Sequence, residues 1–175
     1  MLAAQKLGKA IAEKGLTLVY GGGNVGIMGE LANTVLKYNG QVIGVIPENL
    51  VAREHALKEV TELIVVNSMH DRKATMMKLS DGFIAMSGGI GTLEEFFEVW
   101  TWAQLGIHGK PIGLLNIDKY FDHLIKFIDS IVAEGFVKKE VLKMIIVDEN
   151  PEELIDRMKM HKAPEVTKWI ASDEI

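Results

Sequence analysis

The sequence predicts an α/β fold built on a doubly wound parallel sheet. Short apolar runs bounded by turn residues alternate with segments of helical spacing, which is the pattern of strands joined by crossover helices. Glycine clusters stand at two of the points where an apolar run passes into a helical segment. A chain of 175 residues with 48% apolar content can bury one sizeable core, so we expect a single domain over residues 1–175.

The first half of the chain is expected to form three strands and three helices. A helix over residues 2–14 ends at Gly15, and an apolar strand over 16–20 runs into the glycine-rich stretch 21–29. The helix that follows stops at Asn39 and Gly40. A strand over 41–46 ends at Pro47, residues 48–58 are polar and irregular, and a strand over 60–66 precedes a helix over 68–79.

The second half begins with a buried strand over residues 82–86, followed by the sequence Ser-Gly-Gly-Ile-Gly-Thr-Leu-Glu-Glu at 87–95. A helix over 96–105 ends at Gly106. The remaining expected elements are strands over 111–115 and 144–147 and helices over 119–133 and 151–158, the last with Pro151 in its first turn.

Both glycine clusters predict an anion site. Glycines that open a helix leave its free backbone N–H groups accessible, and the helix dipole is positive at that end. In a parallel sheet, ligands bind beyond the carboxyl ends of the strands, where both clusters and residues 67–73 should lie. We therefore expect a phosphate-bearing ligand at this edge, with two carboxylates, Glu94 and Glu95, in the first turn of the second helix.

Composition limits the remaining classes of partner. The net charge of −5 shows no general nucleic-acid footprint, and no apolar run approaches a membrane span, so we expect neither partner. The sequence has no cysteine, which fits cytoplasmic residence, and its five histidines lack metal-ligand spacing. We expect no metal.

Three local patterns have competing interpretations. Residues 21–26 fit the dinucleotide fingerprint G-x-G-x-x-G, although the acidic residue expected about twenty positions later would be Glu48, after a proline. Thr92 and Glu95 match a capping box, in which Thr92 caps the helix and Glu95 reaches back. Arg72 and Lys73 could lie on a solvated helix face. Near a helix start their charges are unfavourable and need a compensating partner, which a bound phosphate or Glu95 would supply.

Taken together, the motifs resemble the LOG (Lonely Guy) family, the cytokinin riboside 5′-monophosphate phosphoribohydrolases, many of which are labelled "lysine decarboxylase" in bacteria. Residues 87–95 look like its P-G-G-x-G-T-x-x-E signature, with Ser87 in place of the proline. Residues 69–73 match M-H-x-R-K, and residues 19–29 match its first glycine loop. We see no lysine in a recognisable pyridoxal-phosphate context, so the decarboxylase label gains no support.

The resemblance implies a Rossmann-like fold, a homodimer or a larger assembly of dimers, and hydrolysis of the N-glycosidic bond of AMP or N6-prenylated AMP without a cofactor. It makes Arg72 and Glu95 the catalytic pair. It implies substrate contacts from Glu54, Arg72, Lys73, Gly88, Gly89, Ile90, Gly91, Thr92, Leu93 and Glu94, and from Gly22, Gly23, Met28 and Gly29 in the first loop. A non-catalytic nucleotide sensor or carrier on the same fold is the alternative.

The family also begins with a strand and a Gly-Ser-rich loop ahead of the first helix. This sequence opens on that helix. The resemblance therefore implies that the family's first strand, with the loop that contributes to its phosphate site, is missing from this sequence.

Overall fold

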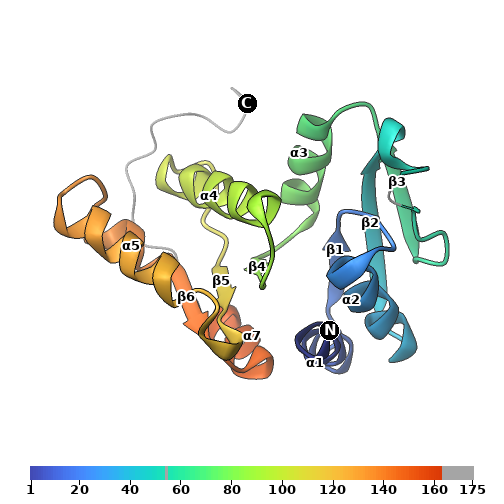
Figure 1. The fold of residues 1–175 in the computed structure, drawn as a ribbon, viewed down its shortest axis with the longest axis horizontal. Coiled ribbons are helices and arrows are strands. Elements are labelled where there is room, and N and C mark those ends of the chain that lie inside the picture. Colours follow the sequence, from blue (N-terminus) through green and yellow to red (C-terminus); the bar gives the residue numbers. More distant parts are fainter. Residues whose placement is uncertain (54, 163–175) are drawn as a thin grey trace. The chain divides into compact units, whose positions relative to one another are not determined.

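The computed structural model describes residues 1–53 and 55–162 (Figure 1). The chain divides into two compact units, Met1–Ser80 and Asp81–Ile175. The single domain expected from the sequence stays a prediction. Within both units helices alternate with parallel strands, which confirms the expected α/β class.

The first unit holds a three-stranded parallel sheet in the order β1-β2-β3. Its central strand is covered on both faces, since Val42, Val45 and Ile46 are fully buried. Tyr20, Gly44 and Leu63 are paired in register across the three strands. The elements are α1 (Leu2–Glu13), β1 (Thr17–Tyr20), α2 (Gly26–Lys37), β2 (Gln41–Pro47), a 3₁₀ turn η1 (Glu48–Leu50), β3 (Glu62–Val66) and α3 (Met69–Leu79).

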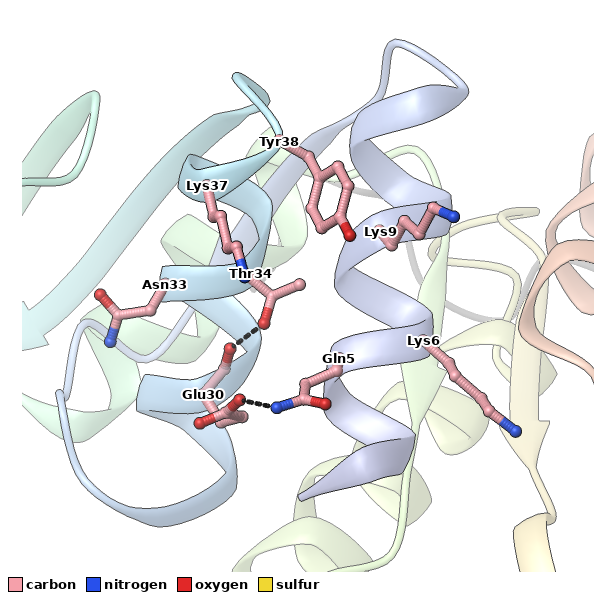
Figure 2. Close-up of a pocket in the computed structure, with 8 residues that line it drawn as sticks. All are labelled: Gln5, Lys6, Lys9, Glu30, Asn33, Thr34, Lys37 and Tyr38. Carbon is pink, nitrogen blue, oxygen red and sulfur yellow. Dashed lines mark hydrogen bonds between the residues drawn. The ribbon is translucent and has the colours of Figure 1, made fainter.

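Helices α1 and α2 pack side by side (Figures 1 and 2). The apolar stripe predicted for α1 is buried, with Ala4, Leu7 and Ala10 at most 2% exposed. A Cβ at Gly8 would lie 2.9 Å from the Cβ of Thr34 on α2. Gly8 therefore permits the close approach of the two helices.

The second unit holds a parallel sheet in the order β4-β5-β6. Its core gathers Phe96 and Trp100 from α4, Ile112 and Leu114 from β5, and Phe121. The elements are β4 (Phe83–Ala85), α4 (Ile90–Gln104), β5 (Ile112–Leu115), a 3₁₀ turn η2 (Ile117–Lys119), α5 (Asp122–Ala133), α6 (Lys139–Leu142), β6 (Ile145–Asp148) and α7 (Pro151–Lys159).

The predicted elements are all present, and most boundaries agree within a few residues. Pro151 is in the first turn of α7, as expected. The short helix α6 was not predicted from the sequence. It is held by its contact with α4, because the indole Nε1 of Trp100 donates to the carbonyl of Val141 at 3.0 Å. In the described part of the chain, no helix combines the length and the apolar character needed to cross a membrane.

Candidate functional site

The first glycine loop joins β1 to α2, and two of its glycines, Gly22 and Gly29, are required by backbone conformation and by close packing. A Cβ at Gly29 would lie 2.7 Å from the backbone carbon of Asn24, so any larger residue would have to move the loop backbone. Gly22 has a φ of +78°, a conformation that side chains rarely adopt. Gly23 is buried beside it, whereas Met28 is exposed in the first turn of α2.

Arg72 lies against this loop. A Cβ at Gly21 would lie 2.8 Å from the guanidinium carbon Cζ of Arg72 and closer still to its Nη2. The side chain is only 6% exposed, and its Nη1 lies 3.7 Å from the sulfur of Met69 as a hydrogen-bond donor. Arg72 is therefore fixed on the backbone of the loop that ends β1, and the two motifs meet in the first unit as predicted.

The helix that carries Arg72 begins with a side-chain cap. The Ser68 hydroxyl accepts from the Asp71 N–H at 3.1 Å and donates to the Asp71 carboxylate at 2.8 Å. This cap, with Asp71 in the first turn, stabilises the positive end of α3. Arg72 directly follows the first turn and the half-buried Lys73 comes next.

The second glycine loop joins β4 to α4, and here the structure corrects the capping-box interpretation. Helix α4 begins at Ile90 with Gly89 as its N-cap and no acidic residue in its first turn. The Leu93 N–H donates to the Gly89 carbonyl at 3.3 Å, so the first helical turn is already formed at Thr92, which the capping box would require as the N-cap. Thr92 is therefore inside the helix, and Glu94 and Glu95 lie in the second turn rather than the first.

The Thr92 side chain packs on Gly88 instead of capping the helix. A Cβ at Gly88 would lie 2.9 Å from the Cβ of Thr92. Gly89 and Gly91 differ, because nothing in the described part of the chain lies within 4 Å of a Cβ built at either position. Ile90 is 89% exposed beside them. Within the described chain, the start of α4 thus has open space at Gly89 and Gly91, and the anion site expected at this loop stays a prediction.

Glu95 is half-buried and Glu94 is exposed. Side chains four residues apart share a helix face and tilt toward the helix N-terminus. Glu95 therefore stands on the face of Gly91, one turn behind the start of α4. Leu93 is half-buried and packs against the core of the second unit.

Two residues of this region were missed by the sequence analysis. The Tyr120 hydroxyl donates to the Gly88 carbonyl at 2.6 Å, and the buried Asn116 holds the turn that carries Tyr120. Strand order puts the end of β5 beside the end of β4. The polar turn after residue 115 was therefore the sequence feature that could have indicated a contact with the second glycine loop.

A buried histidine supports the other end of α4. The backbone N–H of Lys110 donates to Nδ1 of His108, so Nε2 carries the proton and donates to the Val99 carbonyl at 3.0 Å. Burial lowers the pKa of this imidazole, the contact with Val99 raises it, and the Lys110 charge lowers it further, with a net lowering from the ordinary value of 6.5.

Not every predicted site residue can be placed. Glu54 lies outside the described residues. Arg72 belongs to the first unit and Glu95 to the second, so their pairing stays a prediction. Within residues 1–53 and 55–162, no group of three or more His, Asp or Glu side chains is arranged to hold a metal ion.

The dinucleotide interpretation is weakened by Gly26. The third glycine of that fingerprint serves close helix–strand packing, but at Gly26 nothing among the described residues lies within 4 Å of a Cβ. The proline argument against Glu48 does not hold, because Pro47 is itself the last residue of β2 and Glu48 follows the strand directly.

A hollow of about 300 Å³ lies between α1 and α2 (Figure 2). The Gln5 amide donates to the Glu30 carboxylate across it at 2.6 Å. It is lined by Gln5, Lys6, Lys9, Glu30, Asn33, Thr34, Lys37 and Tyr38. None of the predicted site residues is among them.

Comparison with known proteins agrees with the motifs. A family model described as "Possible lysine decarboxylase" matches residues 28–158. The cytokinin riboside 5′-monophosphate phosphoribohydrolase LOG of Oryza sativa is 45% identical over 172 residues, which cover 98% of this chain and 71% of the rice protein. LOG7 of Arabidopsis thaliana, named for the same activity, is 44% identical over 99% of this chain and 81% of its own length.

Solved structures support the fold. The molybdenum cofactor carrier protein of Chlamydomonas reinhardtii superposes with a TM-score of 0.65 at 23% identity, over 91% of this chain and 85% of the carrier. The molybdenum cofactor binding protein of Rippkaea orientalis gives a TM-score of 0.65 at 25% identity, with the same coverage. On the family match and the high identity to its plant members, this chain belongs to the LOG family.

Proposed function

We propose that this protein hydrolyses the N-glycosidic bond of a nucleoside 5′-monophosphate. Water adds to C1′ of the ribose, the bond from C1′ to the base breaks, and free base and ribose 5-phosphate are released. The observation that carries the proposal is the 45% identity, across nearly the whole chain, to a rice enzyme named for this reaction. The substrates that we expect are AMP and N6-prenylated AMP.

The start of α4 is the proposed phosphate site. Its first backbone N–H groups have no partner inside the helix, and the dipole favours an anion there. At Gly89 and Gly91 no side chain stands between these donors and a ligand. The first loop, with Gly22, Gly23, Met28 and Gly29, is the second group of proposed contacts.

Glu95 is the proposed catalytic carboxylate. Cleavage of an N-glycosidic bond passes through an oxocarbenium-like state in which positive charge develops on the ribose. A carboxylate placed beside the sugar stabilises that charge more than it stabilises the neutral ground state, and only such differential stabilisation accelerates the reaction. A sugar whose 5′-phosphate binds at Gly89 and Gly91 would extend along α4 toward the turn that carries Glu95.

Arg72 is the proposed cationic partner of the substrate. A guanidinium forms charge-assisted hydrogen bonds with phosphate or hydroxyl oxygens. Its packing on Gly21 restrains the side chain before substrate binds, so little conformational entropy remains to be lost. Lys73 and Glu54 complete the proposed substrate contacts.

A symmetric homodimer through α4, or a larger assembly of dimers, is part of the proposal. Phe96 and Trp100 are buried in the chain's own core, whereas Phe97, Val99 and Trp102 on the same helix stay only half-buried. A second copy would cover these side chains. Cytoplasmic residence is also proposed, on the absence of cysteine from the sequence.

The test is a direct assay of both products. The protein is incubated with AMP and with isopentenyladenosine monophosphate, and free base and ribose 5-phosphate are quantified. Glu95→Gln keeps the size of the side chain and removes its charge, so turnover should fall about a hundredfold or more with the melting temperature nearly unchanged. Glu94→Gln is the matched comparison and should lose far less, because adjacent helix residues point about 100° apart.

The same assay separates the alternative. A nucleotide sensor or carrier would bind AMP without releasing base. In such a protein Glu95→Gln would change the affinity for AMP only by the electrostatic effect of removing one negative charge. The solved carrier proteins share the fold at 23–25% identity, well below the identity to the named hydrolases. Binding without turnover in the wild-type protein would nevertheless reject the hydrolase proposal.

A further inference from the structure

Tyr120 is bonded to the second glycine loop. Its hydroxyl donates to the carbonyl oxygen of Gly88 at 2.6 Å, between residues 32 positions apart in the chain. Both residues belong to the second unit, at the adjacent ends of β4 and β5. The Tyr120 side chain is 52% exposed, so this contact is not a by-product of core packing.

The turn that carries Tyr120 is held in an uncommon conformation. Asp118 and Lys119 have φ angles of +54° and +59°, a region that residues other than glycine rarely occupy. Two consecutive residues of this kind cost conformational energy and persist only where the surroundings hold them. Such strain is concentrated at functional sites.

Asn116 supplies the restraint. It is 6% exposed, its amide oxygen accepts from the Phe121 N–H at 2.6 Å, and its amide nitrogen donates to the Asp122 carboxylate at 2.9 Å. Its own backbone N–H donates to the carbonyl of Asp148 on β6 at 2.8 Å. These bonds fix both ends of the turn and therefore the position of Tyr120.

The bond to Gly88 determines the direction of the next amide. In a trans peptide the C=O of one residue and the N–H of the next point in opposite directions within one plane. Since the Gly88 carbonyl points at Tyr120, the Gly89 N–H points away from it. Gly89 is also the N-cap of α4, where the proposed phosphate site begins.

We propose that Tyr120 is a positioning residue of the phosphate site: its hydroxyl holds the Gly88–Gly89 peptide so that the Gly89 N–H is directed at the 5′-phosphate. Without this bond the peptide between two glycines could rotate at little steric cost. Because Tyr120 already orders this peptide in the free protein, less conformational entropy is lost when the substrate binds. The inference rests on the proposed function, because it assumes a phosphate at the start of α4.

The test uses Tyr120→Phe, which removes only the hydroxyl. Tyr38→Phe is the matched control, because Tyr38 is a partly exposed tyrosine on the first unit at the end of α2. Ribose 5-phosphate is titrated against each protein by calorimetry, and adenosine is tested as a competitor of AMP. We expect Tyr120→Phe to weaken ribose 5-phosphate about fivefold, the effect of one hydrogen bond, with adenosine inhibition and the melting temperature unchanged.

The outcomes distinguish this inference from the proposed function. Wild-type protein that does not bind ribose 5-phosphate refutes the phosphate site on which this inference rests, whereas the hydrolase proposal is refuted only if the wild type releases no base from AMP. Wild-type binding with an unchanged affinity in Tyr120→Phe refutes the role of Tyr120 and leaves the hydrolase proposal in place. Equal losses for ribose 5-phosphate and adenosine, or a lowered melting temperature, would mean that Tyr120 serves the fold in general, and would also overturn the inference.

Discussion

Replacing Gly21 by alanine should displace the Arg72 guanidinium and impair catalysis, although Arg72 itself is unchanged. The added Cβ would lie 2.8 Å from Cζ of the guanidinium and closer to Nη2. Ordinary contact between carbon atoms begins at about 3.5 Å, so the guanidinium must withdraw by roughly 1 Å or more. Because the displaced atoms are the far end of a flexible side chain, the backbone can stay in place.

The expected cost in catalysis is large and the cost in stability is small. A misplacement of about 1 Å in a catalytic constellation can lower the rate on the order of a hundredfold. We expect kcat/KM for AMP to fall by about that factor in Gly21→Ala. The melting temperature should stay close to that of the wild type, since only the Arg72 side chain has to move.

The double variant Gly21→Ala with Arg72→Ala shows whether the loss of activity in Gly21→Ala arises from displacement of Arg72. If Gly21 acts only by leaving room for the guanidinium, the double variant should be no slower than Arg72→Ala alone. Product release by the three variants and the wild type gives all the rates required. Additive losses, or near-normal turnover in Gly21→Ala, would refute the reasoning.

Three further predictions concern stability, the second loop and assembly. The folded-state pKa of His108 lies below 6.5, so the unfolded chain binds a proton on this ring more readily than the folded chain does. The stability that depends on the neutral ring should therefore be present above about pH 6.5 and be lost as the pH falls below it. Urea unfolding at several pH values should show this loss in the wild type and a weaker one in His108→Gln. Gly91→Ala should raise the free energy of unfolding by about 0.5–1 kcal/mol, because alanine is the better helix former, yet weaken ribose 5-phosphate binding in a calorimetric titration. Light scattering at micromolar concentration should give the mass of a dimer or a multiple of it, and a monomer mass would reject the interface at α4.

The order of the elements could be predicted because it depends on local patterns. Apolar runs, glycine stops and the proline at the start of α7 each act within a few residues of the boundary that they mark. The start of α4 was misplaced because two local signals compete there. Thr92 and Glu95 fit a capping box, but Gly89 adopts the extended N-cap conformation first and the helix has already begun at Ile90.

The candidate site could be predicted only as far as its motifs. The sequence indicated that the first loop and Arg72 lie near one sheet edge, since both follow parallel strands. It could not show that the guanidinium occupies the space above Gly21, nor that Tyr120 reaches Gly88. Both contacts depend on side-chain placement between distant segments, which no local periodicity encodes.

The glycines of the two loops serve different physical needs, and the difference concerns function. At Gly21 and Gly29 the protein's own atoms fill the space that a side chain would need, so packing alone explains these glycines. Gly91 has open space and no left-handed backbone angle, and in the first turn of a helix it costs stability relative to alanine. Neither packing nor backbone conformation within the described chain accounts for a glycine at this position. The phosphate that we propose at the start of α4 would account for it, because any side chain there would stand between the backbone N–H donors and that phosphate.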